Sequence, residues 1–295
     1  MGLTLVLGAL AACGLGAPGD KYSMPTGATS ANTKSPLSNV GMESLSASRN
    51  IPVYWLGKTD GTVSLYREFV QVAGASDPIA DSVRYILAEK PEDPDYFSVW
   101  HPSETVGASV SPDNVITVDI SAKAFSSKLD LGLAERAIAQ LVFTATAAAS
   151  NAGILSEGLE PSVRILVDGQ PAYDAFGHVP LDHNFVRDPK LAAPLWVIDP
   201  QYGTTKKAGR VTFHGVSAKF SGGENWKITR RDSEEDPKPV VARGTLETGG
   251  QSLDHNEFSF SHVLAPGDYT FSLWGVDAQS KKPLAKETKN FTVTE

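Results

Sequence analysis

The sequence predicts an α+β domain over about residues 51–190 and an all-β sandwich over about residues 191–295. Strand-like runs and helical patterns alternate along the first stretch, which favours helices on one face of a mixed sheet. The second stretch has short strand-like runs separated by turn residues. Hydrophobic residues make up 41% of the 295 residues and charged residues 20%, which is typical of globular proteins with about two domains.

The α+β domain begins with a predicted hairpin. Ile51–Leu56 and Thr62–Val72 have strand composition, and Asp60-Gly61 between them is a strong hairpin turn signal. Asp77 and Pro78 then mark a helix start, because Asp caps well and Pro suits the first helical position. Ile79, Val83, Ile86 and Leu87 repeat at helical spacing.

The rest of this domain contains a second hairpin and the longest helix. Pro91–Pro102 is rich in proline and is predicted as loop, and Val106–Val110 and Val115–Ile120 form a predicted hairpin through Pro112-Asp113-Asn114. Leu131–Ala149 is predicted as a helix capped by Asp130. Its apolar stripe is Leu131, Ala134, Ile138, Leu141, Val142 and Ala145. A further strand, VRILV, follows at Val163–Val167.

Seven strands are predicted in the C-terminal stretch, the number of an immunoglobulin-like sandwich. They are Leu195–Ile198, Arg210–His214, Asn225–Thr229, Val240–Leu246, Glu257–His262, Asp268–Gly275 and Thr288–Thr294. Trp226 and Trp274 are expected in its core. Tyr269 follows the turn Pro266-Gly267, and is either a tyrosine corner or an ordinary strand aromatic.

The N-terminal residues predict export and lipid attachment. Met1–Ala12 is apolar and uncharged, too short to span a bilayer but of the length of a signal-peptide core. Leu10-Ala11-Ala12-Cys13 resembles the bacterial lipobox, so residues 1–13 are expected to act as a lipoprotein signal peptide with Cys13 as the lipid attachment site. The alternative is a buried N-terminal segment with a structural cysteine.

Residues 14–50 predict a flexible tether between the anchor and the folded part. They are mostly Gly, Ala, Ser, Thr, Asn and Pro, and they carry too little apolar surface to offset the entropy of ordering. Cys13 is the only cysteine, which excludes an intrachain disulfide and a cysteine-rich zinc site. The scarcity of thiols suits an oxidising exterior.

The sequence offers no catalytic, cofactor or metal motif. A P-loop, a dinucleotide glycine pattern, a Gly-x-Ser-x-Gly elbow and His-Glu-x-x-His are all missing. A net charge of −8 argues against nucleic-acid binding. A weak cluster, His178, Asp182, His183 and Asp188, has metal-ligating residue types but no helix to fix their geometry. The acidic run Asp232, Glu234, Glu235 and Asp236 is typical of a solvated turn.

The first domain resembles the GerMN family in three ordered motifs. Family members carry a Val-Asp-Leu/Ile-Ser step, a Gln-Leu-Val-Tyr/Phe-Thr helix and an Ile-x-x-Asp-Gly strand end. The corresponding segments here are Thr117–Ser121, Ala137–Thr146 and Val163–Pro171, and the strand Val53–Leu56 ahead of them fits the same domain. The resemblance implies an α+β fold with a mixed sheet and two main helices, and a module of sporulation assemblies that associates with itself or with membrane partners.

The C-terminal stretch is similar to the immunoglobulin-like domain of bacterial spore germination proteins. The matching pieces are Trp196–Pro200, Val211–Phe220, Asn225–Ile228 and Leu264–Phe271. A GerMN domain followed by this domain behind a lipobox resembles the arrangement of Gram-positive envelope lipoproteins, which strengthens both assignments.

These observations predict a non-enzymatic lipoprotein, anchored through Cys13 to the outer face of the cell membrane, that binds an envelope protein or itself as a scaffold. The resemblance makes a role in sporulation or germination one possibility. A binder of a small ligand or wall glycan in the cleft between the domains is the alternative. A hydrolase would need the weak 178–188 cluster as its site.

Overall fold

The computed structural model describes residues 50–71, 77–246 and 256–295. All the described residues belong to one compact unit of the chain. The predicted signal segment, Cys13 and the tether up to residue 49 lie outside the described residues. In the described ranges no helix is long and apolar enough to cross a membrane.

The first hairpin forms as predicted, with strands β1 (Asn50–Thr59) and β2 (Thr62–Gln71) paired along their full length. Asp60 and Gly61 both take positive φ, 52° and 80°, as a two-residue hairpin turn requires. Seven consecutive residues are buried in each strand. This continuous burial means that both faces of the hairpin are covered, and it explains why its sequence lacks alternation.

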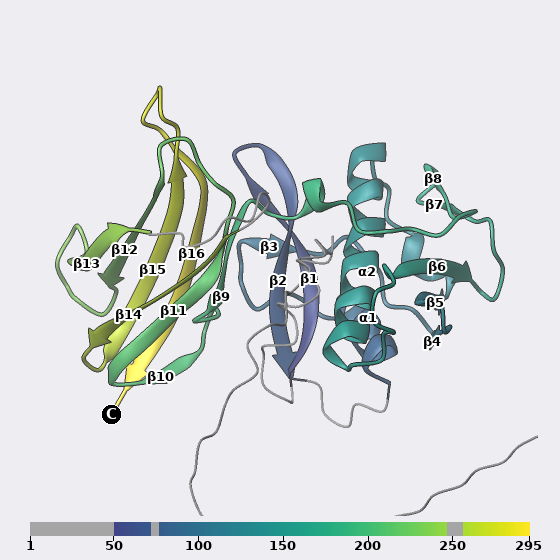
Figure 1. Cartoon of the computed structure of the whole chain (residues 1–295), viewed down its shortest axis with the longest axis horizontal. Helices are drawn as coiled ribbons and strands as arrows, with labels where there is room; N and C mark the ends of the chain where they lie inside the picture. The colour runs from purple at the N-terminus through teal and green to yellow at the C-terminus, as the bar shows by residue number, and fades with distance from the viewer. Residues whose placement is uncertain (1–49, 72–76, 247–255) are drawn as a thin grey trace, which may run out of the picture. The chain divides into compact units, whose positions relative to one another are not determined.

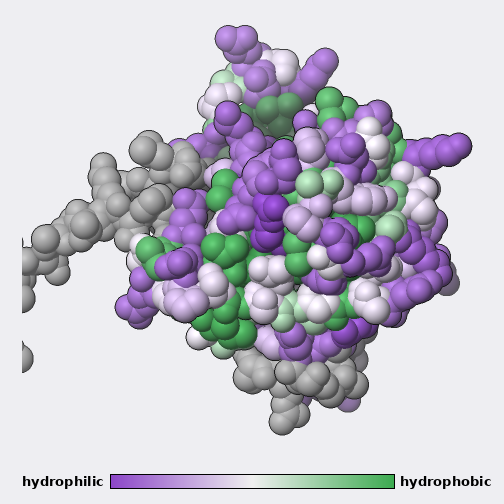
Figure 2. All heavy atoms as spheres, turned by 90° about the vertical axis from the view of Figure 1, so that its right-hand side faces the viewer, coloured by the Kyte–Doolittle hydropathy of each residue, from purple (hydrophilic) through white to green (hydrophobic). Residues whose placement is uncertain are grey.

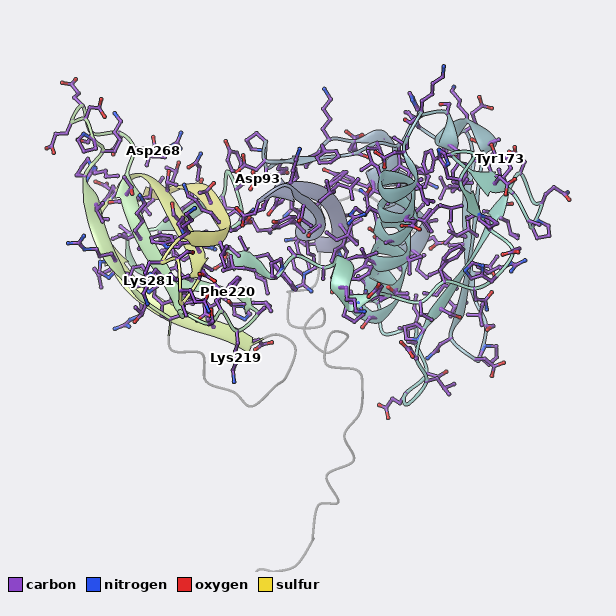
Figure 3. All side chains as sticks on the ribbon, turned by 90° about the horizontal axis from the view of Figure 1, so that it is seen from above. Asp93, Tyr173, Lys219, Phe220, Asp268 and Lys281 are labelled. Atoms are coloured by element: carbon purple, nitrogen blue, oxygen red, sulfur yellow. The ribbon has the colours of Figure 1, made fainter. Side chains whose placement is uncertain are left out.

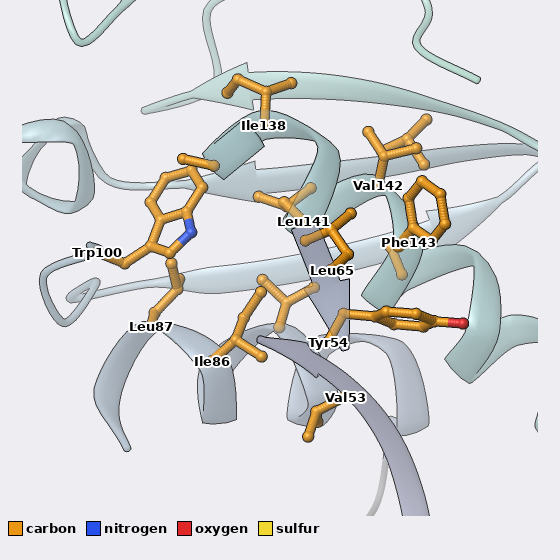
Figure 4. Packing of buried hydrophobic residues seen from close by; sticks show 14 of the residues in the cluster. Val53, Tyr54, Leu65, Ile86, Leu87, Trp100, Ile138, Leu141, Val142 and Phe143 are labelled. Atoms are coloured by element: carbon orange, nitrogen blue, oxygen red, sulfur yellow. The ribbon is translucent and has the colours of Figure 1, made fainter. Parts of the chain in front are cut away.

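Two helices pack against the hairpin. α1 (Pro78–Ala88) begins at Asp77, whose side chain accepts hydrogen bonds from the backbone of Ile79 and Ala80, as predicted. α2 (Leu131–Asn151) begins at Asp130, which accepts from Leu133. Figure 4 shows the α2 side chains packed against those of the hairpin and α1, with Tyr54 beside Phe143 at a ring-centroid distance of 5.2 Å.

The predicted apolar stripe of α2 is buried except at its first residue. Leu131 is 51% exposed, because it lies in the first turn before the helix enters the core. Farther along, α2 is buried on every side from Gln140 to Ala149. Polar residues inside this stretch have partners: Gln140 bonds Tyr54 and Trp100, and Thr144 accepts from Tyr54. The apolar stripe seen in the sequence therefore predicts burial of one face of α2, whereas the second half of the helix is buried on all sides.

A mixed sheet covers the helices on their other side. β4 (Val106–Val110) is antiparallel to β5 (Val115–Ile120), and β5 is parallel to β6 (Ser162–Val167). The hairpin is not part of this sheet; it pairs instead with the short strand β3 (Tyr96–Phe97). The helices lie between the two sheets (Figure 1), which corrects the prediction of one sheet with helices on one face. A small hairpin, β7 (Asp174–Ala175) and β8 (Val179–Pro180), follows β6.

The C-terminal stretch contains all seven predicted strands in two sheets. One sheet has the order β14-β11-β9, and the other has the order β10-β16-β15-β12-β13. The bounds are β9 Leu195–Asp199, β10 Thr205–Lys207, β11 Gly209–Ser217, β12 Glu224–Arg230, β13 Val240–Thr245, β14 Asn256–Leu264, β15 Gly267–Val276 and β16 Pro283–Thr294. β10, which runs parallel to β16, was not predicted because its residues are polar and mostly exposed.

Side chains from both sheets meet in one core, formed by Leu195, Val197, Val211, Phe213, Ile228, Phe258, Leu264, Tyr269, Phe271, Leu273, Ala285, Phe291 and Val293. Trp226 is only partly buried and stacks on Phe260 at the edge of this core. The prediction that Trp274 is a core residue is wrong. Tyr269, Phe271 and Leu273 alternate into the core along β15, so Trp274 falls on the other face.

Tyr269 is a tyrosine corner. Its hydroxyl donates a hydrogen bond of 2.8 Å to the backbone oxygen of Ala265, four residues upstream. This bond ties the start of β15 to the turn that follows β14. Of the two readings of the sequence, the structure therefore supports the tyrosine corner.

Candidate functional site

A buried ionic cluster joins the hairpin region to the C-terminal strands. The Lys289 ammonium lies 2.6 Å from Oδ2 of Asp93 and 2.7 Å from Oε1 of Glu287. It also donates to the Tyr96 hydroxyl at 2.6 Å and lies 4.3 Å from the centre of the Tyr96 ring. Lys289, Asp93 and Glu287 are only 2%, 1% and 4% exposed, so these charges are solvated by one another rather than by water.

The strand β16 positions two members of the cluster by simple alternation. Ala285, Glu287, Lys289, Phe291 and Val293 are buried in turn on one face. The last two enter the C-terminal core, whereas Glu287 and Lys289 meet Tyr96 and Asp93. The same face of β16 therefore supplies charged residues to the cluster and apolar residues to the C-terminal core.

The loop before β3 is fixed around Asp93 and Glu68. Oδ1 of Asp93 accepts from the backbone of Asp95, and the backbone of Tyr96 donates to the Asp93 carbonyl. Glu68 on β2 accepts from the backbone of Asp93 at 3.0 Å and from that of Glu92 at 3.3 Å. Figure 3 shows Asp93 on the side of its region that adjoins the C-terminal strands.

Aromatic packing closes the cluster on the hairpin side. Tyr66 and Tyr96 stack at a centroid distance of 4.8 Å, and the Tyr66 hydroxyl shares a hydrogen bond with Thr59. Gly57 lies beneath them, where a Cβ atom would come within 2.6 Å of the Tyr66 ring. Glycine is therefore required at this position to let the two rings approach the backbone.

Burial sets the protonation behaviour of these groups. It raises the pKa of Glu68 and of Glu287, although Lys289 opposes the rise at both carboxyls. Burial acts to lower the pKa of Lys289, but the Glu287 and Asp93 carboxylates outweigh it and the pKa is raised. Burial also raises the pKa of Tyr66 to about 12 and that of Tyr96 well above its usual value.

Three further polar contacts cross the same junction. Asp60 in the hairpin turn accepts from the backbone of Ala285 at 2.6 Å. The Thr288 hydroxyl donates to Asp95, and Gln201 accepts from the backbone of Phe69 at 2.6 Å. The contacts involve both ends of the hairpin and strand β16, so they hold the two regions in a defined register.

A cavity of about 280 Å³ lies beside the cluster and shares Glu68 with it. Residues of both regions line it: Asn50, Glu68, Phe69, Val70, Gln71, Tyr85, Glu92, Gln201, Tyr202 and Thr204. Among the described residues the lining contains two carboxylates, two phenols and three amides, and none of these described members is Lys, Arg or His. The cavity is therefore rich in hydrogen-bond acceptors and negatively charged.

The structure does not bring the weak 178–188 cluster together as a site. His178, Asp182, His183 and Asp188 are all exposed. His178 contacts the backbone oxygen of Leu129, His183 pairs with Asp182, and Asp188 accepts from the backbone of Lys190 at the start of a 3-10 helix. No group of three or more His, Cys, Asp or Glu residues that could hold a metal occurs in the described ranges.

The acidic run after β12 is a surface turn. Asp232 pairs with Arg230 through a 2.8 Å contact, and this hydrogen bond lowers the pKa of Asp232. Glu234, Glu235 and Asp236 are exposed. Cys13, the predicted lipid attachment site, lies outside the described residues, so its chemistry stays a prediction.

The junction was not predicted, although β16 carried a signal. Glu287 and Lys289 have the same parity as Phe291 and Val293, and opposite charges two residues apart on an apolar face indicate a buried pair. Asp93 and Tyr96 carried no such signal, because the proline-rich segment around them reads as loop.

Comparison with known proteins gives a family match for the first region. Residues 52–173 match the family model Germane, described as sporulation and spore germination. The match covers less than half of the chain. A search of curated proteins found no match.

Similar solved structures include two GerMN structures and a lipoprotein. The tandem GerMN domains of the sporulation protein GerM from Bacillus subtilis are 11% identical, with a TM-score of 0.37 over 62% of this chain and 57% of that one. The first GerMN domain of GerM is 12% identical, with a TM-score of 0.31 over 42% and 85%. A putative lipoprotein from Clostridium perfringens is 15% identical, with a TM-score of 0.30 over 50% and 97%. The chain thus spans little more than half of the tandem GerM structure.

Proposed function

We propose that this protein is a lipid-anchored, extracytoplasmic binding module of the cell envelope that acts in a sporulation- or germination-related assembly. The proposal starts from the match of residues 52–173, called the Germane domain below, to the Germane family model. The family description supports the process, and it names no reaction. The sequence Leu10-Ala11-Ala12-Cys13 supports the anchor. The module is proposed to work by contact with another protein or a second copy, not by catalysis.

We also infer that the C-terminal region is immunoglobulin-like. β9, β11 and β14 form one sheet, and β13, β12, β15 and β16 are neighbours in the other. Taken as strands A, B and E against C′, C, F and G, this order is that of an immunoglobulin-type sandwich. The tyrosine corner at Tyr269 before the F-type strand supports the same assignment.

The observation that carries the binding role is the open edge of β4 in the Germane domain. β4 is the outer strand of its sheet and pairs only with β5. Gly107 and Ser109 are exposed, and the backbone of Val106–Val110 has no partner on the outer side among the described residues. An unpaired edge of this kind accepts an added strand from a partner.

The surface around this edge favours backbone pairing over apolar docking. Figure 2 shows the side of the molecule that carries β4 to β8, where hydrophilic residues predominate and apolar residues occur in small groups. Strand addition fits such a surface because main-chain hydrogen bonds supply most of the contact.

Two lysines on the β4 edge test the binding role. Gly107→Lys with Ser109→Lys places charge on an exposed edge, and the space around Gly107 is open. The double variant is expected to lose an association that the wild type has. Light scattering of the purified protein and proximity labelling of the anchored protein in its host measure this loss. Val241→Lys with Thr245→Lys adds the same charge to the exposed edge strand β13 and is expected to keep it.

A wild-type chain that is monomeric at all concentrations and gives the same labelling pattern as the β4 double variant would contradict the binding role at this edge. The anchor has a separate test. Mass spectrometry of protein from the native host is expected to find diacylglycerol on Cys13, and Cys13→Ala is expected to leave the membrane fraction. A free thiol behind an intact Met1–Ala12 would contradict the anchor.

A further inference from the structure

The cavity beside the junction lies next to three buried carboxylates, and the buried guanidinium of Arg67 on the same strand lies over the ring of Phe69 in the cavity lining. Glu68, Asp93 and Glu287 are each no more than 5% exposed, and Lys289 is the ammonium that faces them. Lys289 directs its contacts to Asp93, Glu287 and Tyr96. Glu68 is held by backbone N–H groups of Glu92 and Asp93, which orient the carboxylate without neutralising it.

Burying a carboxylate is costly unless a positive charge or a proton compensates it. Burial raises the pKa of Glu68, which is the sign of that cost. Glu92, an exposed residue on the cavity rim, adds a second carboxylate to the same lining. A cation bound in the cavity would compensate the negative charge of both carboxylates.

The rest of the lining suits a cation with N–H donors. Burial raises the pKa of the Tyr85 phenol, and the nearby carboxylates of Glu92, Glu89 and Glu68 add to this effect. Tyr85 and Tyr202 add aromatic rings to the lining, which can attract a positive charge, and Gln201 and Thr204 add oxygen acceptors. Among the described lining residues an anion would meet two carboxylates and no Lys, Arg or His.

We propose that this cavity is a binding site for a small organic cation with a primary ammonium or guanidinium head, for which Glu68 and Glu92 supply the countercharge. Its volume, about 280 Å³, lies at the lower end of ligand pockets and limits the ligand to a compact amine. Because residues of both regions line the cavity, such a ligand bridges the Germane domain and the C-terminal strands. The site is independent of the proposed anchor and of the β4 edge.

Calorimetric titration of the full chain with butylammonium and butylguanidinium tests the site. Binding is expected for these cations and not for butanol or butyrate, which have similar size but lack the positive charge. Glu92→Gln and Glu68→Gln are each expected to weaken binding at least about tenfold, because each removes a charged partner of the ligand. Glu135→Gln is the matched control, since Glu135 is exposed on α2 and does not line the cavity.

Several outcomes would overturn the site. Absence of heat with both cations would do so, as would equal binding of butanol. If Glu68→Gln raises thermal stability while no cation binds to the wild type, a proton on Glu68 compensates the charge and the proposal is wrong. Glu92 is at the surface, so Glu92→Gln keeps the test decisive even if Glu68→Gln perturbs the fold.

Discussion

The hairpin β1–β2 and the strand β16 are both well-formed β-structure, yet they bury their residues in different ways. β16 alternates buried and partly exposed residues, as a strand with one core face does. Each strand of the hairpin buries seven residues in a row. Helices cover the hairpin on one face, and residues of the C-terminal region also contact it, at Asp60 in the turn and at Phe69 in β2. Alternation of buried and exposed residues thus indicates a strand with one buried face. Continuous burial indicates a strand that is covered on both faces.

The comparison also explains where the polar groups are buried. The C-terminal core is built mainly of aromatic and aliphatic residues, and Ser217, Glu224 and Ser272 are buried beside them. On the hairpin, Arg67 and Glu68 are buried as well. Glu68 accepts from the backbone of Asp93 in the junction cluster, so the hairpin and β16 each supply buried charged residues to the junction. The junction is held by charge and hydrogen bonding, and each core is held by apolar packing.

The largest effect is expected from removing the single ammonium of the junction. Lys289→Met leaves Asp93 and Glu287 buried without their partner, and it should lower the free energy of unfolding by about 3–5 kcal/mol. Urea denaturation measures this. Lys286→Met on the exposed face of β16 is the control, with an expected change within about 0.5 kcal/mol. Equal effects of the two variants would show that the cluster contributes no stability.

Alkaline pH is expected to weaken the junction next. The folded-state pKa of Tyr66 is raised to about 12, so its contribution is present below pH 10.0 and is lost as pH rises towards 12. The loss from this group is at most about 3 kcal/mol. In Tyr66→Phe, the drop in unfolding free energy between pH 7 and pH 12 should be smaller than in the wild type. An unchanged drop would contradict the raised pKa.

The carboxyls of the junction act in the same direction at lower pH. The pKa values of Glu68 and Glu287 are raised, so their contribution to stability is largest in acid and is lost as pH rises through the folded values.

A packing variant tests the sandwich side of the comparison. In β11, a Cβ atom on Gly215 would collide with the backbone oxygen of Trp196 and with the Phe258 ring. Gly215→Ala should therefore destabilise by about 1–3 kcal/mol, as overpacked cores do. Gly107→Ala in β4, where the space is open, should change stability by about 0.5 kcal/mol or less. Thermal unfolding of both variants measures this difference, and equal stability of the two variants would contradict a steric limit at position 215.

The smallest effect is expected at the tyrosine corner. Tyr269→Phe keeps the ring in the core and removes the hydrogen bond to Ala265, which should cost about 0.5–1.5 kcal/mol. Denaturant unfolding measures the loss. A variant as stable as the wild type would mean that the hydroxyl bond is replaced by water at no cost.

The sequence predicted most of the elements but not their arrangement. Caps at Asp77 and Asp130 and the Asp60-Gly61 turn are local signals, and the structure confirms them. The seven C-terminal strands were predictable because turn residues separate them. Whether the hairpin joins the mixed sheet depends on contacts between segments far apart in the chain, and no local pattern encodes that choice.

The junction was the least predictable part for the same reason. Asp93 and Tyr96 lie in a proline-rich segment that reads as solvent-exposed loop, and their burial depends on Lys289 nearly two hundred residues later. Trp274 shows the complementary error, since size and hydrophobicity suggested the core whereas strand parity places it on the other face. Position in the alternating pattern of a strand therefore predicts burial better than residue type alone.

Hydrogen exchange with mass spectrometry tests most directly whether the ionic junction couples the two cores. In the wild type and in Lys286→Met, the amides of α2 and of β15 should open at the same free energy, as parts of one cooperative unit. In Lys289→Met, one of the two regions should lose protection well before the other. If α2 and β15 still open together in Lys289→Met, the cluster does not couple the regions and the account of the junction is wrong.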